Sequence, residues 1–470
     1  MKKRWILCIL LVLSLLLGSG ITPVLADGSQ AGCYGISATQ SLAGSGKVLD
    51  TAKSVILYEL NTDTMVYSYN PDQRINPTGL VKLLTVLVAL EEEDLDQQVR
   101  VYQTTLNTIT PGSVSAGLKA EEVLTLRELI YCIMVSSAND ACAVLAAHLG
   151  GNQAGFVEMM NEKAAALGCT GSNFTNPHGL TDPEQYSTAR DLAIITKAAL
   201  ENPLFVQLFG VTEYTVPATN KADERKLTST NHMMRPQHAS YDSRITGGKP
   251  AAATNTDRSM ICTAEIGTAR YLCVVIGAKG TVSDNGLVIL RYGIFEEVQA
   301  LMNYAKDGFV VRQILDDGQT MYQYPVGNGQ NDVFLRPSRD VSVVLPIDCD
   351  ISSLTFRQTV DTAGCNAPIA QGQKMGSLTI CYGQIVLGSC DLLAATAVEA
   401  AGSTITQAER LDVADGGANA KWKKWLVNGL LILVLTAVLV TIVYVAARMM
   451  RNAKIRKQQR RRARERKRSR

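Results

Sequence analysis

Two apolar segments, one near each end, constrain this chain most, because together they set where the rest of it folds. Three basic residues at positions 2–4 precede a charge-free, almost wholly apolar stretch over 5–18 and a small-residue site that ends at Ala26. This order is typical of a secretory signal peptide, and the stretch is too short to cross a bilayer comfortably as a retained helix. We therefore expect residues 1–26 to be a signal peptide, cleaved on export.

The second segment, residues 426–447, is free of charge and would be about 33 Å long as a helix. Trp422, Trp425 and Tyr444 lie near its ends, where aromatic residues anchor spans at the membrane interface. Residues 448–470 carry 13 Lys and Arg against one acid, Glu465. A basic flank stays in the cytoplasm. We expect one transmembrane helix, an extracytoplasmic ectodomain in the cell membrane, and a basic cytoplasmic tail that contacts anionic lipid.

Charge and cysteine content exclude some classes of function. Of the 46 Lys and Arg, 3 belong to the signal segment and 13 to the tail, so residues 27–447 hold 30 against 42 acids, about −12. An acidic ectodomain disfavours nucleic-acid binding. Ten cysteines follow the signal segment, but their pairing cannot be deduced from sequence. Because there is no Cys-x-x-Cys pair and the four histidines are scattered, we predict no metal and no cofactor.

The hydrophobic pattern divides the ectodomain into two domains. Residues 27–48 are rich in glycine, serine and alanine without periodicity, which favours a linker. Strand-like and helix-like periods alternate over 49–306, whereas short strand-like runs with turn residues fill 307–400. Residues 401–425 form a polar linker before the membrane helix. We expect a mixed α/β domain followed by a small all-β domain.

Local signals place elements within the first domain. Hairpins are expected over 54–60 with 64–69 and over 260–266 with 269–276. A capping box from Thr125 to Glu128 opens a helix that runs to about residue 135. Other helices are expected over 80–90, 139–149, 154–167, 188–200 and 284–305. A two-residue turn at Gly267-Thr268 would place Cys262 opposite Cys273, within disulfide distance.

Lys82 is the first residue that calls for a functional account. It is the only charge in an otherwise apolar helix, where burial would disfavour the ammonium form. A lysine with a lowered pKa can act as a general base, although a lysine whose stem reaches the surface explains the same pattern. Ser137 and Asn139 lie at a turn between two helices, and Lys249 precedes a hairpin. Separate elements that converge on one cleft are how serine acyl-transfer sites are built.

At these motifs the chain resembles the D-alanyl-D-alanine carboxypeptidases, the low-molecular-mass penicillin-binding proteins. The resemblance implies a β-lactamase/transpeptidase-like fold, an antiparallel sheet flanked by helices, with a trailing β domain and a membrane anchor. It also implies peptidoglycan stem peptides as the substrate class. The stretches that carry it are 53–91 with Lys82-Leu83-Leu84-Thr85, 117–150 with Ser137-Ala138-Asn139, 176–180 and 187–191.

The resemblance also assigns roles to individual residues. In the family a Ser-x-x-Lys helix start supplies nucleophile and base, a Ser-x-Asn loop assists, and a Lys-Thr-Gly strand holds the substrate carboxylate. Carried over, Lys82 is the base, Ser137 and Asn139 are the loop pair, and Lys249 is the strand lysine. His178 and Arg190 also match family positions, but the residues favour a structural role for both.

Two positions depart from the family pattern. The nucleophile position holds Gly79, which has no side chain to acylate, and the strand reads Lys249-Pro250-Ala251. Thr78 stands four residues before Lys82 and is a possible substitute nucleophile, displaced by about a quarter turn. We therefore expect a catalytically impaired family member that binds stem peptides or a wall-synthesis protein. The alternatives are a carboxypeptidase that uses Thr78 or another nucleophile, and a non-enzymatic spacer at the membrane.

Overall fold

The computed structural model describes residues 41–43, 46–91, 94–284, 288–361 and 364–401. The predicted signal peptide, membrane helix and basic tail lie outside these residues. Within them, no single helix is long and apolar enough to span a membrane. Helices α7 (Ala189–Ala199) and α8 (Pro203–Gly210) together have the length and composition, but a 114° bend separates them.

The first domain is built on a five-stranded antiparallel sheet in the order β2-β1-β9-β8-β7. The sheet confirms both predicted hairpins. Its strands are β1 (Ser54–Glu59), β2 (Thr64–Tyr69), β7 (Ile245–Ala252), β8 (Asp257–Ile266) and β9 (Ala269–Lys279). Because β1 pairs with β9, the two ends of this domain's sequence meet at the centre of the sheet.

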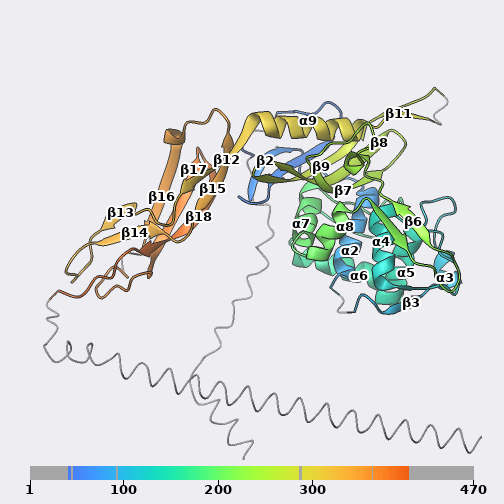
Figure 1. The fold of residues 1–470 in the computed structure, drawn as a ribbon, viewed down its shortest axis with the longest axis horizontal. Coiled ribbons are helices and arrows are strands. Elements are labelled where there is room, and N and C mark those ends of the chain that lie inside the picture. Colours follow the sequence, from blue (N-terminus) through green and yellow to red (C-terminus); the bar gives the residue numbers. More distant parts are fainter. Residues whose placement is uncertain (1–40, 44–45, 92–93, 285–287, 362–363, 402–470) are drawn as a thin grey trace, which may run out of the picture. The chain divides into compact units, whose positions relative to one another are not determined.

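Helices lie on both sides of this sheet, as predicted (Figure 1). Helix α9 (Gly293–Gly308) packs on β8 and β9, while α7 packs on β1 and β9 beside a cluster of further helices. That cluster contains α2 (Lys82–Ala89), α4 (Leu126–Ser136), α5 (Asn139–Leu149), α6 (Gln153–Ala166) and α8. Its members share one apolar core with the sheet, which fixes the loops between them.

The cap of α4 and the second hairpin follow the sequence closely. Thr125 accepts a hydrogen bond from the backbone of Glu128 and the Glu128 side chain returns one, so the predicted capping box is present. In the hairpin, Ile266 pairs with Ala269 around a two-residue turn, and Cys262 lies opposite Cys273. The predicted register is therefore confirmed, and both cysteines are thiols rather than a disulfide.

One predicted helix begins differently. Instead of a single helix over 80–90, a 3₁₀ turn η2 (Thr78–Val81) leads into α2 (Lys82–Ala89). All eight residues of α2 are buried, as its apolar pattern predicted. The tighter first turn places Gly79 on the 3₁₀ segment and Lys82 at the first α-helical position.

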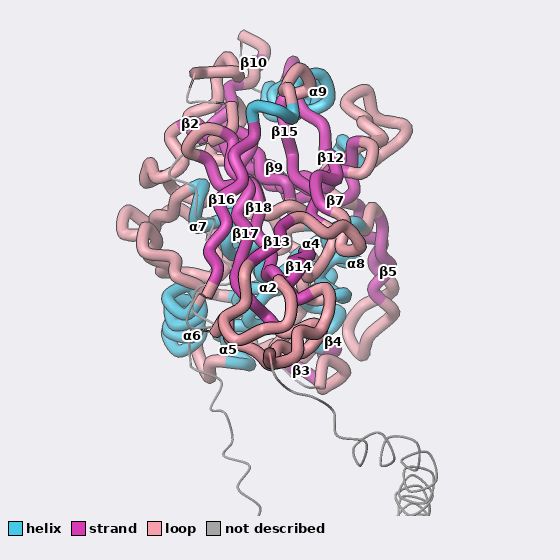
Figure 2. Tube along the Cα trace, turned by 90° about the vertical axis from the view of Figure 1, so that its left-hand side faces the viewer, coloured by secondary structure: helices cyan, strands magenta, loops and turns pink. Residues whose placement is uncertain are grey.

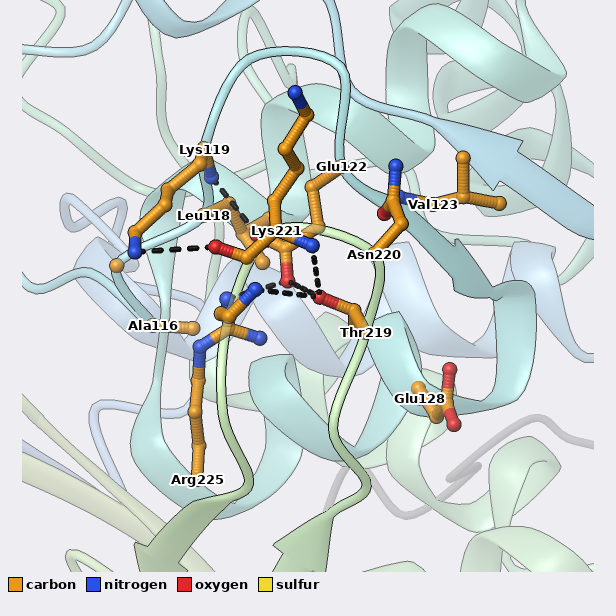
Figure 3. Close-up of polar contacts among 12 residues, drawn as sticks. Ala116, Leu118, Lys119, Glu122, Val123, Glu128, Thr219, Asn220, Lys221 and Arg225 are labelled. Carbon is orange, nitrogen blue, oxygen red and sulfur yellow. Dashed lines mark hydrogen bonds and ion pairs between the residues drawn. The ribbon is translucent and has the colours of Figure 1, made fainter.

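A buried carboxylate ties two loops of the helical region together (Figure 3). Glu122 is fully buried, and it accepts hydrogen bonds from Arg225 at 2.5 Å, from Thr219 at 2.7 Å and from the backbone of Lys119 at 2.9 Å. Arg225 belongs to a hairpin of β5 (Glu213–Val216) and β6 (Arg225–Thr228), which packs on α4. This network holds the hairpin tip against the segment that precedes α4.

The second domain is all-β, as predicted. Strands β12 (Phe309–Leu315) and β15 (Val341–Pro346) pair with each other. A five-stranded antiparallel sheet has the order β13-β14-β18-β17-β16, and Figure 2 shows β16, β17 and β18 side by side. Its strands are β13 (Tyr322–Tyr324), β14 (Val333–Pro337), β16 (Leu354–Val360), β17 (Lys374–Tyr382) and β18 (Ile385–Ala394).

By internal contacts the chain divides into two compact units. The elements named above belong to the first unit. Among the described residues, the second consists of three short segments, 325–332, 365–370 and 397–401. These segments are joined by isolated bridges, such as the one between Ile369 and Val398.

Candidate active site

The turn that carries Gly79 has an unusual backbone. Thr78 has a φ of +50°, a left-handed conformation that is costly for a β-branched residue. Gly179 approaches this turn so closely that a Cβ on it would lie 1.9 Å from the carbonyl oxygen of Thr78. Only glycine fits there, so the segment around residues 176–180 packs directly against the turn. Backbone strain of this kind is typical of functional sites.

Lys82 follows on the same turn, and its side chain is 2% exposed. Its ammonium group donates to Oδ1 of Asn139 at 2.8 Å and to the backbone oxygen of His178. Burial lowers the pKa of Lys82, against a smaller opposing effect of Cys142. The lysine therefore does not reach the surface along the core. Two acceptors hold its ammonium group inside the protein.

Ser137 and Asn139 lie at the junction between α4 and α5. Ser137 caps α4 in the left-handed conformation, with a φ of +63°. Asn139 is the first residue of α5, and its backbone N–H donates to Val114 at 2.8 Å. The sharp turn between the helices therefore brings the hydroxyl and the carboxamide to the same place as Lys82.

Lys249 lies on β7, the edge strand of the sheet, and is 1% exposed. Its ammonium group donates to the backbone oxygen of Met134 at 3.2 Å. Burial and the charge of Lys82 lower its pKa to about 7. Pro250 follows it, and an edge strand is where a sheet tolerates proline.

These elements enclose a cavity of about 430 Å³. It is lined by Gly79, Lys82, Ser137, Asn139, Pro250 and Ala251, together with residues from the segments 112–114 and 178–180 and with Ala252, Thr230 and Arg258. Lys249 and Thr78 are not among the lining residues. The structure thus brings four elements distant in sequence around one space, with Lys249 buried behind it.

The position of Gly79 is the most informative detail of the cavity. A Cβ built on this glycine would lie 3.5 Å from Cβ of Ala251, 3.7 Å from Nζ of Lys82 and 3.8 Å from Oγ of Ser137. These are ordinary van der Waals distances, and the φ of Gly79 is not positive. A side chain at residue 79 would therefore fit without strain and would point at the lysine and the serine.

The charge in the cavity is positive. Lys82 and Arg258 line it, and no carboxylate does so among the described residues. The guanidinium of Arg258 lies 4.9 Å from the ring centroid of Tyr292, a cation–π contact that orients it. Such a site suits an anionic group on its ligand. Sequence reasoning missed Arg258, because only the register of β7 with β8 places it opposite Ala252.

His178 and Arg190 differ in their relation to the site. His178 lines the cavity; burial and the charge of Lys82 lower the pKa of its imidazole to about 4, and its backbone oxygen binds Lys82. Arg190 instead forms a bidentate ion pair with Asp72, at 2.6 and 3.0 Å, and does not line the cavity. His178 thus contributes to the site mainly through its backbone.

Acidic side chains that could hold a metal lie away from the cavity. In the described part of the chain, Asp316, Asp317 and Asp340 form the one cluster of three or more such ligands, and all three are exposed. None lines the cavity. The cavity itself offers hydroxyl, amide and amine groups, which suit acid–base chemistry and anion binding.

Comparisons with known proteins agree with this geometry. Residues 44–280 match the D-alanyl-D-alanine carboxypeptidase family, and residues 309–400 match the penicillin-binding protein 5 C-terminal domain. The chain is 26% identical over 336 residues to D-alanyl-D-alanine carboxypeptidase DacF of Bacillus subtilis, covering 70% of this chain and 81% of the relative. It is 27% identical over 339 residues to D-alanyl-D-alanine carboxypeptidase DacD of Escherichia coli, covering 70% and 82%.

Solved structures agree as well. Penicillin-binding protein 5 of Haemophilus influenzae aligns with a TM-score of 0.60 at 26% identity, covering 76% of this chain and all of that one. PBP3 of Streptococcus pneumoniae, described as a peptidoglycan synthesis regulatory factor, shares the fold with a TM-score of 0.61 at 22% identity, covering 74% and 99%. Sequence and fold agree, and the chain belongs to the D-alanyl-D-alanine carboxypeptidase family.

Proposed function

We propose that this protein binds peptidoglycan stem peptides, or a wall-synthesis partner, at the cavity but does not form an acyl-enzyme. The observation that carries the proposal is the glycine at residue 79. Its missing side chain would point at Lys82 and Ser137, at 3.7 and 3.8 Å from Cβ. The groups that would activate and assist a nucleophile surround a position that has no hydroxyl.

The chemical consequence is large. Acyl transfer through a covalent intermediate needs an activated hydroxyl, and loss of the serine in another serine hydrolase lowers turnover about a millionfold. Pro250 removes a second family feature, the hydroxyl on the strand that binds the substrate carboxylate. Ala251, which replaces the family glycine, adds a Cβ 3.5 Å from where a Cβ of residue 79 would lie. Three changes at one site support lost catalysis.

Catalysis through Thr78 is the alternative enzymatic reading. Its Oγ1 is buried and has no hydrogen-bond partner among the described residues. It is also not among the residues that line the cavity. A nucleophile must reach both the substrate and its base, so this placement argues against Thr78.

Covalent labelling with a fluorescent penicillin, followed by denaturing electrophoresis, tests the proposal. We expect no labelled band from the unaltered protein, because the hydroxyl that opens the β-lactam is missing. Gly79→Ser should restore a band if the altered strand is tolerated, since the new side chain fits beside Lys82. Gly79→Ala is the matched control, because it adds the Cβ without the hydroxyl. A band from the unaltered protein would disprove the proposal.

A second assay separates the remaining readings. The protein is incubated with a pentapeptide stem, and release of D-alanine is measured along with binding of the same peptide. Binding without release supports the proposal. Release that disappears in Thr78→Ala establishes a carboxypeptidase that uses Thr78. Neither binding nor release indicates the non-enzymatic spacer.

A further inference from the structure

A second cavity, of about 380 Å³, lies on the C-terminal β domain. Its lining is made almost wholly of polar side chains from three segments of that domain. Four are hydroxyls and two carry charge: Ser338, Ser377, Thr379, Ser389, Arg339 and Asp391. The remaining lining residue, Cys390, is only 6% exposed. We call this cavity the hydroxyl groove.

The floor of the groove is one face of the sheet at β17 and β18. Thr379 lies opposite Ser389, and Ser377 lies opposite Asp391. Paired positions hold their Cβ atoms about 5 Å apart, and next-but-one residues along a strand are about 7 Å apart. The four side chains therefore form a regular array of polar groups on one face, with Ser338 and Arg339 beside it.

Each of the two charged residues has a partner in the protein. Arg339 donates to the backbone oxygens of Ser389 at 2.8 Å and of Asp340 at 3.4 Å. The carboxylate of Asp391 forms an ion pair with Lys374 at 2.8 Å. The guanidinium retains further N–H groups, and the carboxylate retains lone pairs, that can face a ligand. These contacts favour one orientation of each side chain.

The hydroxyl groups, in contrast, have no hydrogen-bond partner among the residues that the structure describes. None of the four side-chain oxygens, on Ser338, Ser377, Thr379 and Ser389, hydrogen-bonds to another residue in the described ranges. Each hydroxyl can both donate and accept. The groove therefore offers donors and acceptors in an array with no preference for one sign of charge.

This chemistry selects among ligand classes. Protein interfaces are enriched in aromatic residues and depleted in serine, and none of the described aromatic residues lines the groove. Among the lining residues Arg339 is the one cation, and Lys374 nearby is paired with Asp391, so the groove lacks the cluster of basic groups that binds a phosphate or another polyanion. A single carboxylate is too few for a metal site. A neutral ligand that carries many hydroxyl groups matches the array.

We propose that the hydroxyl groove binds a neutral saccharide, such as a stretch of N-acetylated glycan chain. The same polar face extends onto β16, where Arg357 lies opposite Thr379 and Thr359 lies opposite Ser377. The exposed Arg357 and Thr359 would lengthen the site across a third strand. The groove would give the protein a contact with glycan separate from its peptide-binding cavity.

Calorimetric titration of the full chain in detergent micelles tests the proposal, with the tetramer of β-1,4-linked N-acetylglucosamine as the probe. The variants are Thr379→Val, which keeps the side-chain shape, and the double variant Thr379→Val with Ser389→Ala. Loss of one hydrogen bond should weaken binding about 2- to 10-fold, and the double variant should lose more. Thr320→Val is the matched control, because Thr320 is exposed in the same domain but does not line the groove.

The outcomes separate this proposal from its rivals. Binding that weakens in the groove variants, with unchanged affinity in the control and unchanged melting curves, supports it. No binding of the tetramer overturns it, as does binding that the groove variants leave unaltered, which would place the sugar elsewhere. Inorganic phosphate is titrated in parallel, and groove-dependent binding of phosphate without binding of the tetramer would mean an anion site instead. None of these results depends on residue 79. The penicillin-labelling assay therefore tests the proposed loss of acylation independently of the groove.

Discussion

Lys249 keeps a titratable group buried behind the candidate-site cavity. Burial and the charge of Lys82 lower its pKa to about 7, from 10.5. Between these values the unfolded chain binds more protons than the folded protein, so this residue makes stability rise with pH across that window. Below about pH 7 the folded protein bears the full cost of the buried charge.

Replacing Lys249 with methionine should remove this dependence. Relative to the unaltered protein, Lys249→Met should gain stability at pH 6, and its advantage should shrink by up to about 1.4 kcal/mol per pH unit above pH 7. Urea unfolding at several values of pH measures the difference. Lys226→Met serves as the control, because the Lys226 side chain is 66% exposed and should follow the unaltered protein. A difference that stays constant with pH would contradict the prediction.

Arg258 is a second basic residue with a predicted effect, here on which ligands the cavity binds. It lines the cavity beside Pro250, where the hydroxyl of the family's strand is lost. No ion pair with a carboxylate is found for it among the described residues. We expect Arg258→Ala to weaken binding of acetyl-D-alanyl-D-alanine about 10- to 100-fold, the effect of one charged hydrogen-bond partner. The C-terminal amide of the same dipeptide should be affected much less. Arg270→Ala is the control, because Arg270 does not line the cavity. If Arg258→Ala lowered the affinity for the acid and for the amide equally, a contact between Arg258 and the carboxylate would be refuted.

Among the structural elements, the β5–β6 hairpin depends on one buried ion pair. Burial alone would raise the pKa of Glu122, but hydrogen bonds from Arg225, Thr219 and the Lys119 backbone bring it below its ordinary value (Figure 3). A lowered carboxylate pKa contributes stability above the unfolded value of about 4.5, and this contribution is lost as pH falls through the folded value. The hairpin should therefore loosen in acid.

The neighbouring glutamates give a matched test of this pair. Glu122→Gln should lower the free energy of unfolding by about 3 kcal/mol, because it leaves Arg225 as a largely buried charge without its partner. Glu121→Gln should cost less than about 1 kcal/mol, since both side chains of the Arg100–Glu121 pair are more than half exposed. Thermal or urea unfolding at neutral pH compares the two variants. Equal effects would show that burial of Glu122 has little energetic consequence.

Elements specified by local chemistry could be predicted from the sequence, whereas those specified by packing could not. The α4 cap and the turn at Gly267-Thr268 depend on residues a few positions apart, and both are found as predicted. Helix α8 was not predicted, although Asn202 caps it and Pro203 occupies its first turn. The 3₁₀ start of α2 packs against Gly179, about 100 positions away, a contact that no local pattern reveals.

The same limit applies to the candidate site. The motif residues Lys82, Ser137 and Asn139 were identified from the sequence, and the structure places all three on one cavity. Arg258 carries no motif and reaches the cavity only through strand register. Neither the exposure of Lys249 nor the direction of a side chain at residue 79 could be read from the sequence, because both follow from how β7 meets η2.

For the whole molecule, family matches at 44–280 and 309–400 agree with the predicted order of an α/β domain and a β domain. Export and anchoring rest on sequence alone, namely on the apolar segment 426–447 and the 13 basic residues after it. We propose that the two domains lie outside the cell membrane, where peptidoglycan is found, and that the tail lies inside. This topology matters for function because the anchor would hold both proposed binding sites near the wall.

Protease digestion of intact cells tests this topology. External protease should remove both domains and leave residues 448–470 protected, because the basic flank is retained on the cytoplasmic side. An epitope tag after Arg470 and antibodies to the β domain report the two sides, and permeabilised cells show that the tag can be digested once exposed. Replacing the basic residues of the tail with glutamine should weaken the orientation and make some of the tag accessible. Digestion of the tag in intact cells that carry the unaltered chain would reverse the assignment of sides.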